Sequence, residues 1–267
     1  MHLTSVHVPA PFGAHAETFP FNIPLVKAAP KIDFTAPVTF FVGENGSGKS
    51  TLLEAIASAA GSITVGTADT ENDVSLAAVR KLAKTLKLAW RKKTRKGFFL
   101  RSEDYFGYVR RLARTRAELE RELQEAEADY QGKSELARAM GTLPYKKELH
   151  ALNTRYHGDL DNRSHGESYL AFFQARFVPD GLYLLDEPEA PLSPVRQLAM
   201  IAMLKQMVGQ GAQFIIATHS PILMAFPGAA ILSFDTHPPR PVAYETLEHV
   251  TLTRDFLNNP EQFLNHL

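Results

Sequence analysis

Apolar runs of strand length alternate along the chain with stretches whose apolar positions recur every three or four residues. The clearest runs cover residues 38–42, 182–185 and 213–217, and polar or glycine-rich residues bound each of them. Stretches with helical spacing cover residues 49–60, 70–83, 166–176 and 194–208, and a last strand is predicted near 230–234. Strands that alternate with helices predict an α/β fold with a mostly parallel sheet flanked by helices.

Three regions depart from this alternation. Residues 1–42 contain six prolines and are predicted to form short strands, as a β-rich lead-in rather than helix. In residues 85–101, Leu86, Leu88 and Trp90 alternate with other residues, a basic turn follows, and the apolar segment 97–101 returns, which predicts a β-hairpin. Residues 103–155 are charged, and an apolar stripe predicts helices that are too short for a long coiled-coil arm. The predicted interruptions of these helices are Gly132, Gly141 and Pro144.

The composition adds few constraints. The chain has 267 residues, 45% of them hydrophobic, which is enough for one large core or for one core plus a subdomain. The formal net charge is zero, so no overall field attracts nucleic acid or anionic lipid. The absence of cysteine excludes disulfides and thiolate metal sites and favours a cytoplasmic location. No apolar run is long enough to span a membrane. We therefore expect a single domain over residues 1–267, with a helical insert at about 103–163.

A glycine-rich loop directly follows the strand at residues 38–42 and precedes a helix. Its sequence fits the phosphate-binding pattern G-x-x-x-x-G-K-[S/T] in the strand–loop–helix setting that this pattern needs, which argues against a plain turn. Glycines let backbone N–H groups approach an anion, and the helix directs its positive dipole end at the phosphates. Lys49 is expected to reach the β- and γ-phosphates, and Ser50 to ligate Mg²⁺. The predicted ATP-binding residues are Gly43, Glu44, Asn45, Gly46, Ser47, Gly48, Lys49, Ser50 and Thr51.

Polar residues end two further strands of the predicted sheet. Asp186 and Glu187 follow the strand at residues 182–185, and His219 follows the strand at residues 213–217. Asp186 can hold the Mg²⁺ shell through water, and Glu187 can polarise an attacking water as a general base. His219 can sense a γ-phosphate by donating a hydrogen bond. Taken alone, Asp186 and Glu187 could simply form an ordinary junction between a strand and a turn, and His219 could cap the next helix. The phosphate loop upstream favours a role in nucleotide binding for all three residues.

These motifs, together with Ser-His-Gly-Glu-Ser at residues 164–168, resemble the ABC-type ATPases, and most closely the small stand-alone SMC-like ATPases of bacteria. In that family a signature opens a helix a little over twenty residues before the acidic pair, and Ser164 precedes Asp186 by 22 residues. The resemblance implies an ATP-sandwiched homodimer in which the signature of one protomer closes the phosphate site of the other. The signature residues that would act in trans are Ser164, His165, Gly166 and Glu167.

The chain departs from the family pattern at three places. His165 stands where the transporter consensus has glycine, and the loop at residues 189–194 lacks its usual closing aspartate. Glu103 occupies the place of the family's glutamine and is a further candidate for lining the Mg²⁺ site. These departures bear on the geometry of hydrolysis rather than on nucleotide binding.

Several functions suit this set of motifs. The first is an ATPase that dimerises around ATP and Mg²⁺ and couples closure to a protein partner, which the sequence does not identify. In this function Lys49, Glu187 and His219 are the catalytic residues. The alternatives are the ATP-binding subunit of a membrane transporter and a slow, ATP-dependent interaction module that acts on nucleic acid or in defence.

One charged segment stands apart from the nucleotide motifs. Residues 80–96 contain nine lysines or arginines and no acid, with Trp90 among them. A basic ribbon with an aromatic residue suits phosphate contacts and base stacking on nucleic acid. The alternative is a solvated hairpin whose charge is balanced by the acidic helix at residues 118–129.

Overall fold

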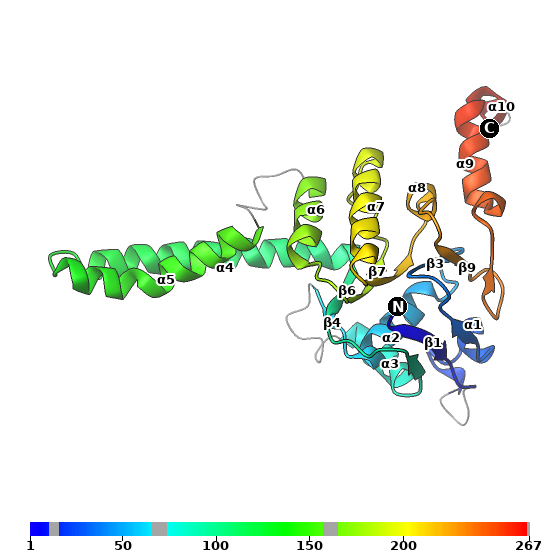
Figure 1. Cartoon of the computed structure of the whole chain (residues 1–267), viewed down its shortest axis with the longest axis horizontal. Helices are drawn as coiled ribbons and strands as arrows, with labels where there is room; N and C mark the ends of the chain where they lie inside the picture. The colour runs from blue at the N-terminus through cyan, green and yellow to red at the C-terminus, as the bar shows by residue number, and fades with distance from the viewer. Residues whose placement is uncertain (11–15, 66–73, 157–164, 266–267) are drawn as a thin grey trace.

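The computed structural model describes residues 1–10, 16–65, 74–156 and 165–265, and it contains two β-sheets (Figure 1). The strands of the main sheet, in spatial order, are β10 (Arg240–Pro241), β9 (Ala230–Ser233), β3 (Val38–Val42), β8 (Gln213–Ala217), β7 (Leu182–Asp186), β6 (Gly97–Arg101) and β4 (Ile63–Thr64). Of these strands, β10 pairs antiparallel with β9, and the others are parallel to their neighbours. The predicted α/β fold with a mostly parallel sheet is confirmed.

Helices cover both faces of the main sheet, which is why its central strands are continuous apolar runs. Every residue of β3, β7 and β8 is buried. Successive side chains of a strand point to opposite faces, and Phe40 packs in the core with Leu204 of α7, whereas Phe41 packs with Ile56 of α2. The covering helices are α2 (Lys49–Ala60) and α3 (Val74–Ala83) on one side and α6 (His165–Arg176) and α7 (Pro194–Gly209) on the other (Figure 1).

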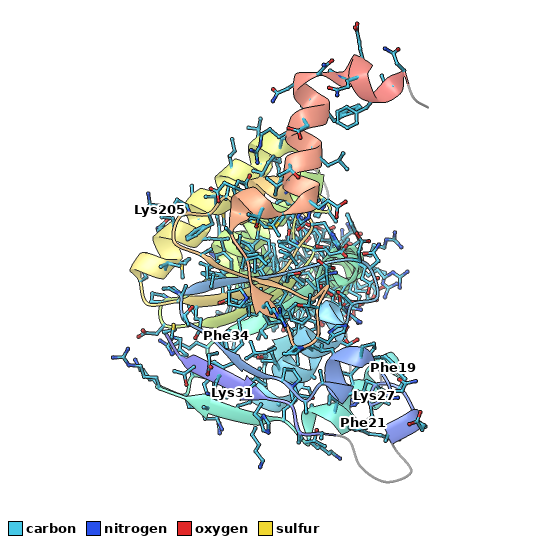
Figure 2. All side chains as sticks on the ribbon, turned by 90° about the vertical axis from the view of Figure 1, so that its right-hand side faces the viewer. Phe19, Phe21, Lys27, Lys31, Phe34 and Lys205 are labelled. Atoms are coloured by element: carbon cyan, nitrogen blue, oxygen red, sulfur yellow. The ribbon has the colours of Figure 1, made fainter. Side chains whose placement is uncertain are left out.

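The predicted hairpin at residues 85–101 is wrong. Strand β5 (Lys87–Trp90) pairs antiparallel with β1 (Leu3–His7), in a three-stranded sheet with the order β2 (Lys31–Asp33), β1, β5. Strand β6 instead enters the main sheet parallel to β7. The burial patterns explain the separation, because β5 is exposed at alternate positions whereas β6 is buried on both faces. Figure 2 shows the small sheet beneath the main one, with Lys31 on it.

Gly97 makes this crossing between the two sheets possible. Its φ of +107° is strained for any residue with a side chain, and an added Cβ would lie 1.9 Å from the backbone oxygen of Leu182. The close approach lets the backbone N–H of Leu182 donate to the oxygen of Lys96, at 3.0 Å. Strand β6 therefore pairs with β7 from its first residue, directly after the basic turn.

The lead-in is β-rich as predicted, but it also contains a short helix, α1 (Pro24–Lys27). Pro24 stands at the first helical position, where its missing N–H costs no hydrogen bond. The prolines of this region therefore do not all exclude helix. Leu25 and Val26 of α1 are buried in the core cluster that also contains α2.

The charged segment forms a two-helix arm that projects from the body (Figure 1). Helix α4 (Ser102–Asp129) is about 42 Å long, and α5 (Glu135–Tyr156) returns along it, with a 3.1 Å ion pair from Lys146 to Glu127 between them. Gly132 lies in the connection as predicted, but Gly141 and Pro144 lie inside α5, so the predicted breaks there are wrong. An added Cβ on Gly141 would lie 2.5 Å from the Tyr130 ring, so glycine serves packing there, and contacts with α4 sustain the helix past Pro144.

The chain ends in short helices beyond β8. They are α8 (Pro221–Met224), the 3₁₀ helix η2 (Tyr244–Thr246), α9 (Glu248–Asn258) and α10 (Pro260–Leu264). No helix in the described parts of the chain is long and apolar enough to cross a membrane.

Candidate nucleotide-binding site

The glycine-rich loop connects β3 to α2 at the carboxyl end of the parallel strands. Gly43 has a φ of +136°, and an added Cβ would lie 2.7 Å from Oδ1 of Asp235. Gly48 has a φ of +95° and immediately precedes α2, so it turns the chain into the helix. The loop therefore has the backbone curvature that a phosphate-binding loop needs.

The amine of Lys49 lies within this loop. Its Nζ donates to the backbone oxygen of Gly43 at 2.6 Å and to that of Glu44 at 2.8 Å. Burial lowers the pKa of Lys49, and the nearby carboxylates, that of Asp186 foremost, oppose this effect. A buried cation at the start of a helix, ringed by loop backbone, is suited to bind the terminal phosphates of a nucleotide.

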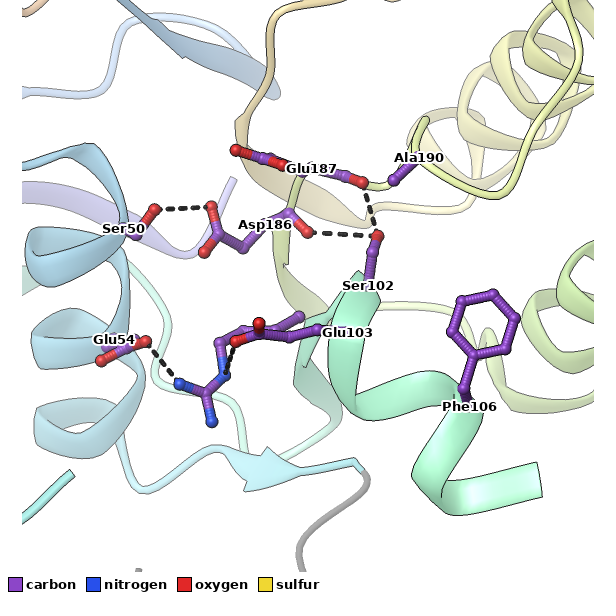
Figure 3. A pocket seen from close by; sticks show the side chains of 9 residues that line it. Ser50, Glu54, Ser102, Glu103, Phe106, Asp186, Glu187 and Ala190 are labelled. Atoms are coloured by element: carbon purple, nitrogen blue, oxygen red, sulfur yellow. Dashed lines mark hydrogen bonds and ion pairs between the residues drawn. The ribbon is translucent and has the colours of Figure 1, made fainter. Parts of the chain in front are cut away.

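Ser50 and Asp186 meet although 136 residues separate them in the sequence. The Ser50 hydroxyl donates to Oδ1 of Asp186 at 3.1 Å (Figure 3). Burial raises the pKa of Asp186 to about 7, and the hydrogen bond from Ser50 opposes the shift. A divalent cation would offset the cost of burying this carboxylate, so the pair fits Mg²⁺.

Protein oxygens alone do not complete this site. Within the described ranges, no cluster of three or more His, Cys, Asp or Glu side chains is arranged to hold a metal ion. Mg²⁺ prefers six oxygen ligands and usually keeps several waters beside substrate phosphates. Ser50 and Asp186 therefore suit an ion that arrives with a nucleotide.

The backbone around Glu187 is held from two strands and a helix, while its side chain is exposed. Glu187 has a φ of +49°, a costly conformation that is typical of functional sites. Its N–H donates to the oxygen of Ala217 on β8 at 2.8 Å, and the Ser102 hydroxyl donates to its carbonyl oxygen at 2.5 Å. Tyr169 of α6 lies behind this contact, with its hydroxyl 3.1 Å from Oγ of Ser102. The arrangement directs a carboxylate away from the sheet beside the Ser50–Asp186 pair.

A pocket of about 410 Å³ opens next to these groups (Figure 3). Arg101 lies in it, with Nη1 3.0 Å from Oε1 of Glu54 and Nε 2.8 Å from Oδ2 of Asp104. The side chain of Glu103 is mostly exposed and lies 3.7 Å from Nε of Arg101. Glu103 therefore lines the same pocket as Asp186, and its role in metal binding stays a prediction. The lining residues are Ser50, Glu54, Arg101, Ser102, Glu103, Phe106, Asp186, Glu187 and Ala190.

His219 lies at the carboxyl end of β8 with an exposed side chain. Its backbone N–H donates to Oε1 of Glu189 at 2.8 Å, and burial raises the pKa of that carboxyl. The cap of helix α8 is Ser220, whose Oγ accepts from the N–H of Leu223 at 3.1 Å. The capping explanation therefore applies to Ser220, and the imidazole of His219 is left for another role.

The signature segment is described only in part. Ser164 lies outside the described residues, and α6 begins at His165. Glu167 pairs with Arg196 of α7 at 3.0 Å, and an added Cβ on Gly166 would lie 2.7 Å from Cδ of Arg196. Gly166 and Glu167 therefore pack against the start of α7, and their predicted action on a second protomer stays a prediction.

Asp235 is a residue of the site that the sequence analysis missed. It follows β9, and its Oδ1 accepts from the backbone N–H of Glu44 at 2.8 Å, while its Oδ2 accepts from Oγ of Ser233 at 2.9 Å. It thereby holds the first turn of the phosphate loop. The rule that selected Asp186, a carboxylate at the end of a buried parallel strand, would also have selected Asp235.

Substitution of Asp235 should separate its hydrogen bond from its charge. Asp235→Asn and Asp235→Ala remove the same charge, but Asn keeps an acceptor for the N–H of Glu44. We expect the Ala variant to bind ATP about three- to tenfold more weakly than the Asn variant, the effect of one lost hydrogen bond. Titration calorimetry would measure both affinities, and equal values would show that this contact does not position the loop.

A comparison with protein-family models agrees with this geometry. Residues 23–136 match the family model described as an AAA domain. A search of curated proteins finds no match to the sequence. Among similar solved structures is the Smc head domain of Pyrococcus furiosus, with an extended coiled coil and bound to the C-terminal domain of ScpA. It is 11% identical with a TM-score of 0.48, over 96% of this chain and 99% of that one.

Two further similar structures are an SMC head domain and a component of an ABC transporter complex. The SMC head domain of Thermotoga maritima is 16% identical with a TM-score of 0.42, over 91% of this chain and 100% of that one. The cbiO1 protein of Clostridium perfringens, part of the ABC transporter complex cbiONQ, is 14% identical with a TM-score of 0.45, over 100% of both chains. The AAA-domain match over residues 23–136, the phosphate-loop geometry and the parallel strand order of this chain together indicate a P-loop fold, in which a phosphate-binding loop follows a strand of a mostly parallel sheet.

Proposed function

We propose that the protein binds ATP with Mg²⁺ and hydrolyses it to ADP and phosphate. The observation that supports this most strongly is the convergence of Lys49, Ser50, Asp186 and Glu187 at one end of the sheet, with Ser50 and Asp186 in direct contact. A phosphate cradle, a metal site and a general base are the parts that phosphoryl transfer to water needs. A kinase would also need a pocket for an acceptor substrate, and the water-activating carboxylate favours hydrolysis.

Each residue has one task in this proposal. Lys49 and the loop N–H groups bind the β- and γ-phosphates, and Ser50 and Asp186 hold Mg²⁺, which neutralises phosphate charge when bound. Glu187 accepts a proton from the water whose oxygen attacks the γ-phosphorus, while the bond from that phosphorus to the β-phosphate oxygen breaks. His219 donates a hydrogen bond to the γ-phosphate, and ADP and phosphate leave.

The proposal includes closure of two protomers around ATP. The side chain of Glu187 is exposed, and the loop at residues 189–194 and the start of α7 also contain exposed residues. On α7, Val195 and Leu198 are 75% and 58% exposed. A signature supplied in trans by Ser164 would add a hydroxyl donor and a helix dipole to the γ-phosphate side. ATP that bridges two protomers stabilises only the closed state, and hydrolysis removes the bridge, which can drive a protein partner.

Single-turnover kinetics would test hydrolysis directly. With the protein in excess over radiolabelled ATP and with Mg²⁺ present, we expect labelled phosphate to appear from bound ATP, and chelation of Mg²⁺ with EDTA should abolish its release. Stable binding without phosphate release would favour the alternative, an interaction module that uses ATP as a ligand. Hydrolysis that starts only when a membrane partner is added would favour the transporter subunit.

A further inference from the structure

A dense basic surface lies away from the nucleotide site, and we call it the basic edge. It runs from the end of α3 through β5 and the turn before β6, and all of its lysine and arginine side chains named here are exposed. These residues are Lys81, Lys84, Lys87, Arg91, Lys92, Lys93, Arg95 and Lys96. Such a concentration of one charge in a chain with no net charge requires an explanation.

The acidic stretch of α4 does not neutralise the basic edge. Glu120, Glu125 and Glu127 of that stretch form ion pairs within the arm, with Arg116, Arg121 and Lys146. The arm projects sideways from the body, whereas α3 lies beneath it (Figure 1). On the basic edge, Lys92 has an exposed ion pair with Asp180, at 3.4 Å. The acidic residues of α4 therefore lie away from the basic edge. Counted over the described residues, the basic edge carries a local excess of positive charge.

The basic edge and the phosphate loop lie at opposite ends of the main sheet. Lys96 immediately precedes β6, which begins level with Leu182, the first residue of β7. Asp186 ends β7, and the phosphate loop follows the carboxyl end of β3, which is parallel to β7 through β8. Five residues of strand separate the two ends by about 16 Å. An anion bound at the basic edge would therefore leave the nucleotide site free.

The turn that carries the basic edge is fastened to the protein core. Nδ1 of the buried His2 ring lies 3.1 Å from the backbone oxygen of Lys92, and Nε2 lies 3.1 Å from that of Gly211. The N–H of Arg91 donates to the oxygen of His2 at 2.8 Å, and Oγ1 of Thr94 donates to the oxygen of Asp180 at 3.0 Å. The backbone of this surface is preorganised, which lowers the entropic cost of binding a partner.

The side chains of the basic edge favour some classes of binding partner over others. Leu86, Leu88 and Trp90 are partly buried against the core cluster, so the basic edge offers no exposed apolar anchor for a lipid surface. Trp90 packs partly against the same core cluster, which favours a structural role over the base stacking suggested by the sequence. Lysines on an edge strand also discourage pairing with an added peptide strand. The partner that best fits this surface is therefore the phosphate backbone of a nucleic acid.

We propose that the basic edge binds the phosphodiester backbone of nucleic acid, through charge and without base stacking. Seven of its eight cations have no ion pair with the described residues, namely Lys81, Lys84, Lys87, Arg91, Lys93, Arg95 and Lys96. Each phosphate neutralised on a duplex releases counterions and contributes about −0.9 to the slope of log K against log salt. The affinity should therefore fall steeply with salt and depend little on base sequence.

Fluorescence anisotropy with a labelled 30-base-pair DNA duplex, between 25 and 200 mM salt, would test this proposal. The triple variant K87Q/R91Q/K93Q should bind at least tenfold more weakly at low salt, with a slope shallower by about 2 to 3. The matched control R110Q/R114Q/K147Q makes the same change in charge on exposed positions of the arm and should bind as the parent does. ATP affinity and hydrolysis should be unchanged in K87Q/R91Q/K93Q, which separates this proposal from the proposed function.

Three results would overturn the proposal. The first is no binding of the duplex at 25 mM salt. The second is an equal loss of affinity in the two triple variants, which would indicate a general charge effect. The third is binding to vesicles of phosphatidylserine and phosphatidylcholine that exceeds duplex binding at the same salt and is lost in K87Q/R91Q/K93Q, which would make the surface a membrane contact.

Discussion

Replacing Glu187 with glutamine should lower the rate of ATP hydrolysis at least 100-fold and leave ATP binding intact. The exposed Glu187 side chain is the proposed base, and general-base catalysis contributes roughly 10²- to 10⁴-fold. Glutamine keeps the size of the side chain and accepts no proton. The backbone contacts of Glu187 with Ala217 and Ser102 do not depend on the carboxylate, so the local conformation should persist. Phosphate release under single-turnover conditions would measure the loss.

The same variant should trap the closed dimer. Light scattering of Glu187→Gln should give the 29.6 kDa mass of one chain without nucleotide and about twice that mass with ATP and Mg²⁺. Glu118→Gln, on the exposed surface of the arm, makes the same change in charge and should hydrolyse ATP as the parent does. A Glu187→Gln protein that hydrolyses ATP normally would exclude Glu187 as the base. A mass that ignores bound ATP would exclude closure of a homodimer while leaving hydrolysis open.

Replacing Lys49 with methionine should weaken ATP binding at least 100-fold. The amine is buried, and its nearest acceptors are the loop carbonyl oxygens of Gly43 and Glu44, so it is already within reach of phosphates bound in the loop. Hydrogen bonds to charged groups contribute about 1.5–3 kcal/mol each, and two of them account for a factor of 100 or more. Titration calorimetry with ATP and Mg²⁺ would measure the loss.

Folding controls are needed because Lys49 is in the core. Burial disfavours the charged amine, as the lowered pKa of Lys49 indicates, and methionine has a similar length without a charge to desolvate. We therefore expect Lys49→Met to melt at or above the temperature of the parent protein. Lys205→Met, at an exposed position of α7, removes the same charge and should bind ATP normally. Unchanged affinity in a folded Lys49→Met protein would exclude the proposed phosphate site.

Features that depend on residues close together in the sequence were predictable without the structure. Strands β3, β7 and β8 are continuous apolar runs because helices bury both of their faces, and this pattern can be recognised without the structure. The phosphate loop was predictable because its glycines, Lys49 and Ser50 act within one turn of backbone. The contact of Ser50 with Asp186 followed as well, since parallel strands present their carboxyl ends at one edge of a sheet.

Partners that are far apart in the sequence were decided by tertiary packing. The chain leaves β5 in one sheet and enters another at β6, and two strand-like segments on either side of a basic turn could not distinguish this path from a hairpin. Ser102 reaches the carbonyl of Glu187, and Asp235 reaches the N–H of Glu44, across 85 and 191 residues. Such contacts depend on which strands become neighbours, and many pairings of short strands satisfy the same local pattern. The chain by itself thus determined the chemistry of its nucleotide loop and the alternation of its elements, because both depend on adjacent residues. Only the folded sheet decided which distant side chains hold that loop in place and at which end the basic edge lies.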